Sequence, residues 1–223
     1  MPTITDLTGP AGFLEAVLDL PALRTATGAP RAAAVFAHPH PQYGGTLHTK
    51  AVYQGAKGLA RIGCAVLRFN FRGVGRSAGE FDNGDGEMAD FRAALDYMAA
   101  NYPDSPLWAA GFSFGAWVAL EAGAVDPRVS VLVGIAPPVA TSVSGMNYNF
   151  PNTLASTKPK FFVQGEADNV CPIEGMWAFY GKLEEPKELV VIDAADHLFD
   201  GRTQEVGEAL EELLADFGTE RKP

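Results

Sequence analysis

The chain has 223 residues, of which 47% are hydrophobic and 20% charged, and its formal net charge at pH 7 is −10. This length and composition are typical of one globular domain and exclude a disordered chain, so residues 1–223 are expected to form a single domain. The few basic residues are spread thinly, which argues against a nucleic-acid partner, and no apolar run is long enough to cross a membrane.

Short apolar runs alternate along the chain with segments of helical periodicity. The apolar runs predict strands at 13–20, 32–37, 64–69, 107–110, 129–135, 160–164 and 188–193. The periodic segments predict helices at 47–62, 87–100, 114–123, 173–183 and 203–217. Strands and helices that alternate with short links favour an α/β fold, with a mostly parallel central sheet and helices on both faces.

Two segments fall outside this alternation. Residues 136–159 contain four prolines and scattered polar residues, and a stretch of this length predicts either a functional loop or a small cap. Residues 219–223 are expected to form a loose tail. The N-terminus has neither the basic start nor the apolar core of a secretion signal, so we expect a cytoplasmic protein.

The clearest chemical motif is Gly111-Phe112-Ser113-Phe114-Gly115, which lies between a predicted strand and a predicted helix. This is the G-x-S-x-G pattern and the strand–turn–helix context of a nucleophile elbow. The turn exposes the serine hydroxyl, and the helix that follows directs free N–H groups at the place where negative charge develops. The alternative is a serine that only caps the helix.

A serine hydroxyl needs a base that takes its proton. Of the four histidines, His197 alone follows the last predicted strand, which returns it to the same edge of the sheet as Ser113. Asp168 follows the strand at 160–164 and is the candidate acid that orients the imidazole, with Glu166 as second choice. A simple turn aspartate is the alternative for Asp168. The order Ser–Asp–His is that of α/β-hydrolases.

An acyl-transfer site also needs two N–H donors for the oxyanion. The backbone of Phe114 is one candidate, and the other should come from the loop His38-Pro39-His40-Pro41 after the strand at 32–37. Prolines have no N–H, and His40, between two of them, is the better placed donor. We expect His38 to hydrogen-bond beneath this loop. A metal site built from His38, His40 and His48 is a weaker alternative, because no cysteine or glutamate accompanies them.

Two further features, residues 73–78 and the two cysteines, carry weaker signals. Residues 73–78 match the G-x-G-x-x-A dinucleotide pattern, but a turn-rich loop follows where that fingerprint requires a helix. We therefore expect no organic cofactor and no metal. Cys64 is the first residue of an apolar run and is expected to be a buried thiol, whereas Cys171 lies in a later loop. A disulfide between the two cysteines stays an alternative.

These motifs together resemble those of a known family. In order they are His38-Pro39-His40-Pro41, Asn70-x-Arg72-Gly73-x-Gly75-x-Ser77, Gly111-x-Ser113-x-Gly115, Gly165-x-x-Asp168 and Asp196-His197. The set, which spans about 13–217, is similar to α/β-hydrolases and most closely resembles small bacterial esterases related to dienelactone hydrolases. The resemblance implies the α/β-hydrolase fold and an oxyanion donor at His40. Dienelactone hydrolases themselves carry cysteine at the elbow, so Ser113 favours a general carboxylesterase.

The resulting expectation is a serine carboxylesterase that hydrolyses small, short-chain esters through an acyl-enzyme. Residues 136–159 are shorter than the lids of many lipases, which implies a minimal cap. A thioesterase, amidase or acyltransferase on the same triad stays an alternative, as do a non-catalytic ligand-binding protein and an oxidoreductase that uses residues 73–78. The sequence does not fix the oligomeric state. The positions of the loops predict which side chains line the pocket for the acyl group. These are Phe114 and, in addition, Tyr43, Met146, Tyr148, Phe150 and Phe199.

Overall fold

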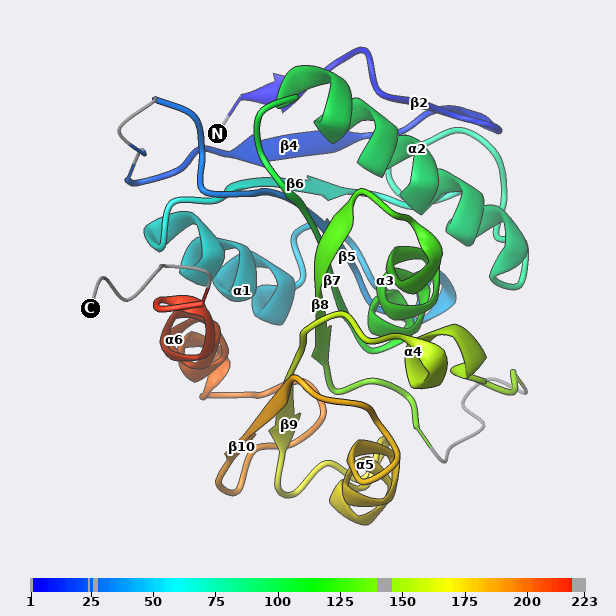
Figure 1. Cartoon of the computed structure of the whole chain (residues 1–223). Helices are drawn as coiled ribbons and strands as arrows, with labels where there is room; N and C mark the ends of the chain where they lie inside the picture. Colours follow the sequence, from blue (N-terminus) through cyan, green and yellow to red (C-terminus); the bar gives the residue numbers. More distant parts are fainter. Residues whose placement is uncertain (1, 24, 26–27, 140–145, 218–223) are drawn as a thin grey trace.

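The computed structural model describes residues 2–23, 25, 28–139 and 146–217, and its centre is a twisted sheet (Figure 1). Within these residues eight strands are hydrogen-bonded in the order β1-β4-β6-β5-β7-β8-β9-β10. From β6 to β10 the neighbours are parallel, and β4 and β1 add an antiparallel edge. The strands are β1 (Thr3–Ile4), β4 (Ala16–Asp19), β5 (Ala33–Ala37), β6 (Ala65–Phe69), β7 (Leu107–Phe112), β8 (Val129–Ile135), β9 (Lys160–Gly165) and β10 (Lys187–Ile192).

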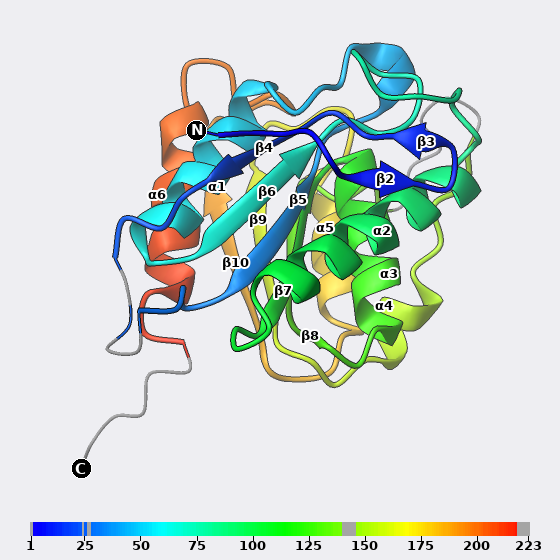
Figure 2. The same ribbon diagram turned by 90° about the horizontal axis from the view of Figure 1, so that it is seen from above.

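Helices cover both faces of the sheet, which explains why its central strands read as continuous apolar runs (Figures 1 and 2). Alternate side chains of β5 enter different cores: Phe36 packs with α1 and α6, and Val35 packs with α2 and α3. The structure therefore has the predicted α/β-hydrolase architecture. The helices are α1 (Lys50–Arg61), α2 (Asp85–Asn101), α3 (Phe114–Val125), α4 (Pro151–Ala155), α5 (Ile173–Tyr180) and α6 (Thr203–Leu214).

Besides the short strand β1, which was not predicted, the structure differs from the predicted elements chiefly in two places. The single strand predicted at 13–20 is divided: β3 (Gly12–Phe13) pairs with β2 (Thr8–Gly9) in a separate hairpin, and only β4 joins the main sheet. The irregular stretch 136–159 contains the short helix α4, which five residues are too few to reveal by periodicity. The Glu121 side chain on α3 stabilises α4 by accepting hydrogen bonds from the Asn152 and Thr153 backbone N–H groups.

The register of the parallel strands brings several strand ends to one edge of the sheet. Ala37 pairs with Gly111 across β5 and β7, and Gly165 pairs with Ile192 across β9 and β10. The loops that leave these strands therefore meet, as expected for the carboxyl edge of such a sheet. In the described part of the chain, every helix is too short or too polar to span a bilayer.

Candidate active site

Ser113 lies at a sharp turn between β7 and α3, with φ 54° and ψ −120°. L-residues rarely adopt this conformation, which corresponds to the first central position of a type II′ turn. The two flanking positions have no room for any side chain, so both must be glycine. A Cβ at Gly111 would lie 2.1 Å from the Gly115 carbonyl oxygen, and a Cβ at Gly115 would lie 2.4 Å from the His38 carbonyl oxygen. The sequence therefore forms the strained elbow that G-x-S-x-G predicts.

The structure brings the three predicted triad side chains into one hydrogen-bonded line. His197 Nε2 lies 3.0 Å from Ser113 Oγ, and His197 Nδ1 lies 2.8 Å from Asp168 Oδ2. The imidazole packs on the Phe112 ring, with 5.3 Å between centroids, and its side chain is 12% exposed, whereas that of Asp168 is fully buried. This arrangement can move a proton from the serine hydroxyl to an imidazole whose charged form the carboxylate stabilises.

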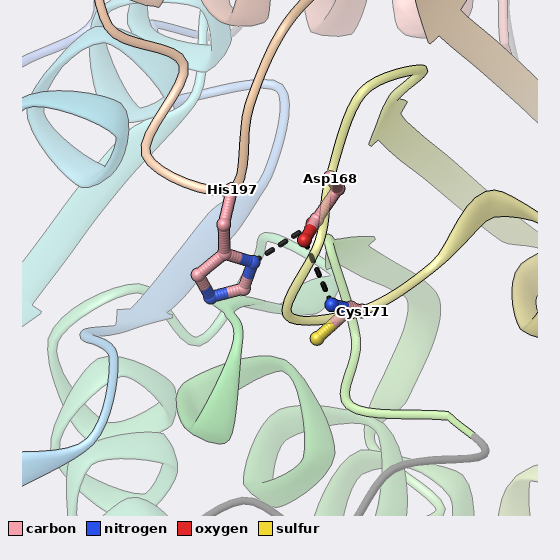
Figure 3. A group of neighbouring side chains, drawn as sticks. All are labelled: Asp168, Cys171 and His197. Atoms are coloured by element: carbon pink, nitrogen blue, oxygen red, sulfur yellow. Dashed lines mark hydrogen bonds and ion pairs between the residues drawn. The ribbon is translucent and has the colours of Figure 1, made fainter.

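Four hydrogen bonds hold the Asp168 carboxylate, of which Figure 3 shows those with His197 and Cys171. Oδ1 accepts hydrogen bonds from the Val170 and Cys171 backbone N–H groups at 2.9 and 2.7 Å. Oδ2 accepts one from the Gln164 side chain at 3.1 Å in addition to that from His197. Sequence reasoning missed Gln164, although an amide at the buried end of an apolar strand was a usable signal, because buried polar groups need partners.

The second candidate for the acid, Glu166, is engaged elsewhere. Its carboxylate accepts a hydrogen bond from the Ala194 N–H at 2.9 Å and so ties the loop after β9 to the loop after β10. The structure therefore places Asp168, and not Glu166, against His197.

One group of side chains has the composition of a metal site, namely Asp168, Cys171 and His197, whose donor atoms lie within 4.8 Å of one another (Figure 3). The carboxylate already accepts four hydrogen bonds, and His197 Nδ1 is used by Asp168. Burial, with a smaller effect from the Asp168 charge, raises the pKa of the Cys171 thiol and disfavours the thiolate that metals bind. Cys171 and Cys64 are both free and buried, so they form no disulfide.

The histidines considered for a metal do not converge. His38 is fully buried, and both of its ring nitrogens are hydrogen-bonded, to the Pro39 carbonyl and the Phe71 N–H. His40 Nδ1 accepts from the Gln42 N–H, and His48 is exposed. Among the residues that the structure describes, no group of three metal-ligating side chains includes them.

The predicted oxyanion donors come from two segments that are in contact beside Ser113. Phe114 is the first residue of α3, where backbone N–H groups have no partner within the helix. His40 lies in the loop after β5, just before the 3₁₀ helix η1 (Pro41–Tyr43), and it lines the same cavity as Ser113. The His40 and Phe114 rings pack together with 5.1 Å between centroids, so the loop and the elbow are in direct contact.

A cavity of about 230 Å³ opens at Ser113. Its lining is largely apolar, and its mouth is formed by Tyr43, which is 65% exposed, and Leu198, which is 53% exposed. Sequence reasoning missed Val170 and Leu198, each of which follows closely after a predicted triad residue. The lining residues are Pro39, His40, Tyr43, Ser113, Val170, His197 and Leu198.

Of the predicted acyl-pocket residues other than Phe114, only Tyr43 is among those that line this cavity. Tyr148 packs against Trp117 and lies close to Met146. Phe150 packs on Phe179, and Phe199 is fully buried against Phe112. These four residues are not among those described as lining the cavity at Ser113, because the described part of 136–159 packs along α3 and α5 and Phe199 turns inward.

Known proteins match most of this chain. Residues 28–156 match the family described as serine aminopeptidase, S33. An uncharacterised protein of Rickettsia prowazekii (strain Madrid E) is 36% identical over 212 residues, which cover 92% of this chain and 86% of that protein.

Two solved structures have similar sequences and the same fold. An α/β serine hydrolase homologue from Coxiella burnetii is 37% identical, with a TM-score of 0.85 over 96% of this chain and 97% of that one. A member of the α/β serine hydrolases without a lid, from Xanthomonas campestris, is 36% identical, with a TM-score of 0.83 over 95% of this chain and 92% of that one.

Proposed function

Because the chain belongs to the α/β serine hydrolases, we propose that it is a carboxylesterase that hydrolyses small esters with short acyl chains. The observation that carries the proposal is the hydrogen-bonded line from Ser113 through His197 to Asp168, which opens onto an apolar cavity. Such a line supplies an activated nucleophile, and the cavity supplies a binding surface for an uncharged acyl or alcohol group.

In the proposed reaction, Ser113 Oγ attacks the ester carbonyl carbon while His197 Nε2 takes the hydroxyl proton. Asp168 holds the imidazole and stabilises its charged form. The backbone N–H groups of His40 and Phe114 stabilise the oxyanion, and His197 returns the proton to the leaving alcohol. Water, activated by His197, then cleaves the acyl-enzyme and releases the carboxylic acid.

The size of the cavity supports a small substrate. Its volume of about 230 Å³ lies below the roughly 300–1,000 Å³ of pockets that enclose drug-sized ligands. The exposed Tyr43 and Leu198 side chains leave the mouth open, so one part of a substrate can extend into solvent. We therefore expect the enzyme to discriminate mainly against bulk in the part of the ester that enters the cavity.

Peptide-bond cleavage is the second candidate, because the matching family is named for a serine aminopeptidase. An aminopeptidase must bind the charged α-amino group of its substrate, which normally requires a carboxylate close to the nucleophile. None of the residues described as lining the cavity is acidic. This lining favours an ester with a neutral acyl group over a peptide with a free N-terminus.

The test is a panel of p-nitrophenyl esters of increasing acyl length, with leucine p-nitroanilide beside it, on the wild type and Ser113→Ala. Ser130→Ala is the matched control, since this serine lies near the start of β8, at the opposite end of the sheet. We expect turnover of short-chain esters that Ser113→Ala abolishes and Ser130→Ala retains. Unchanged activity in Ser113→Ala would overturn the assignment of the nucleophile. Faster hydrolysis of the anilide than of any ester would favour the peptidase.

A further inference from the structure

We propose that His38 is a positioning residue for the reaction: its buried imidazole holds the Pro39–His40 peptide in the orientation that aims the His40 N–H at the oxyanion. This inference rests on the proposed function. It assigns a role in acyl transfer to a side chain that lies outside the triad and is not among the residues lining the cavity.

The imidazole of His38 bridges two loops at the edge of the sheet. Its Nδ1 lies 2.6 Å from the Pro39 carbonyl oxygen, and its Nε2 lies 3.0 Å from the backbone nitrogen of Phe71, in the loop after β6. The carbonyl needs a donor and the N–H needs an acceptor. Both requirements are met by one neutral tautomer, with the proton on Nδ1.

The charge state of His38 agrees with this assignment. The side chain is fully buried, and burial lowers its pKa to about 4. The ring is therefore neutral at physiological pH and keeps one donor and one acceptor. Because both ring nitrogens are occupied and neither bonds Ser113, the imidazole acts through the backbone that it holds.

Holding the Pro39 carbonyl also fixes the His40 N–H. The two groups belong to one planar trans peptide unit, in which C=O and N–H point in opposite directions. The neighbouring rings of Pro39 and Pro41 restrict the backbone on either side. Gly45 packs directly against the Pro39 carbonyl, because a Cβ at Gly45 would lie 2.0 Å from the Pro39 oxygen. This contact further restricts the peptide.

The same segment is in contact with the nucleophile elbow. A Cβ at Gly115 would lie 2.4 Å from the His38 carbonyl oxygen, so the backbone of His38 lies directly against the turn that carries Ser113. His38 therefore links three parts whose relative placement matters for an oxyanion: its ring joins the loop with His40 to the loop with Phe71, and its backbone lies against the elbow.

Two substitutions separate the two hydrogen bonds of the ring. In His38→Asn the amide nitrogen lies near the position of Nδ1 and can still donate to the Pro39 carbonyl, whereas the Phe71 N–H loses its acceptor. In His38→Gln the amide oxygen lies near the position of Nε2 and can still accept from Phe71, whereas the Pro39 carbonyl loses its donor. Each variant leaves one buried backbone group unpaired, so the two are matched in stability.

The measurements are kcat, KM and thermal stability for the ester that the wild type prefers, with inhibition by a trifluoromethyl ketone that forms a tetrahedral oxyanion with serine. Loss of one oxyanion donor costs about 10²–10³ in kcat, and we expect a misaligned donor to cost roughly 10–100-fold. His38→Gln should therefore show this loss in kcat, an unchanged KM and a parallel rise in Ki. His38→Asn should stay within about 3-fold of the wild type.

Equal losses of kcat in the two variants, or a fully active His38→Gln, would overturn the inference. The tautomer of wild-type His38, measured from imidazole ¹⁵N chemical shifts, tests it without any variant. A proton on Nδ1 supports the inference, and a proton on Nε2 overturns it even if both variants misfold. A wild type that hydrolyses no ester would instead refute the proposed function, so the two failures are distinguishable.

Discussion

The strained backbone at Ser113 predicts that the variant Ser113→Gly has a higher free energy of unfolding than Ser113→Ala. This is the reverse of the usual order, in which alanine is the more stabilising residue. At φ 54° and ψ −120° a side chain has an unfavourable conformation that costs about 1–3 kcal/mol, and glycine avoids this cost. Glycine ordinarily lowers the free energy of unfolding by about 0.5–1 kcal/mol relative to alanine, because it gives the unfolded chain more conformational entropy. Ser113→Gly should therefore exceed Ser113→Ala in unfolding free energy by about 1–2 kcal/mol.

The comparison of these two variants removes other effects, because both lose the hydrogen bond to His197 and both lose the nucleophile. For a chain of this size, each kcal/mol shifts Tm by about 2–4 °C, so we expect Ser113→Gly to melt about 2–8 °C above Ser113→Ala. Calorimetry and urea unfolding would measure the difference. Ala93→Gly, in the middle of α2, measures the ordinary cost of glycine. If Ser113→Gly were less stable than Ser113→Ala by that same amount, the turn would hold no strain.

Three further predictions concern the groups around the site. Gln164→Met removes the side-chain hydrogen bonds to the Asp168 carboxylate and to the Cys171 carbonyl. A bond to a charged group is worth about 1.5–3 kcal/mol, so kcat should fall roughly 10–100-fold; steady-state kinetics at an unchanged KM would show it. Burial lowers the pKa of His38 from the ordinary 6.5 to about 4, so as the pH falls the imidazole is protonated in the unfolded chain before it is protonated in the folded one. The free energy of unfolding is therefore highest above pH 6.5 and decreases as the pH falls toward 4. This loss should amount to roughly 3 kcal/mol in urea titrations, and His38→Asn should reduce it. Leu198→Ala widens the mouth of the cavity and removes apolar contact, so the preference for butyrate over acetate esters should fall about 3–10-fold in kcat/KM; an unchanged preference would place the acyl chain elsewhere.

The fold was predictable where one physical requirement dominates the sequence. Strands buried on both faces must be apolar throughout, which located β5 and β8 almost to the residue. The run at 64–69 predicted β6 despite Arg68, whose guanidinium is fully buried and paired with Asp19 at 2.7 Å. The short β2–β3 hairpin and α4 gave no comparable signal, because each is only a few residues long.

The positions of Ser113, Asp168 and His197 followed from topology, since each comes directly after a strand that ends at the same edge. The acyl pocket did not follow, because it depends on how loops turn. Phe199 illustrates the difference: a positive φ of 55° turns its ring into the core against Phe112, whereas Leu198 beside it stays at the surface. Sequence spacing alone does not distinguish these two neighbours.

The parallel register described above makes catalysis depend on the assembly of most of the sheet. Phe112 pairs with Ile135, Ile135 with Val163, and Gly165 with Ile192, so the strands before Ser113, Asp168 and His197 are aligned through three successive pairings. A slip of one residue moves a strand by about 3.3 Å, which exceeds the 3.0 Å between His197 Nε2 and Ser113 Oγ. Hydrolase activity would consequently report the correct alignment of these strands, which helical content alone does not reveal.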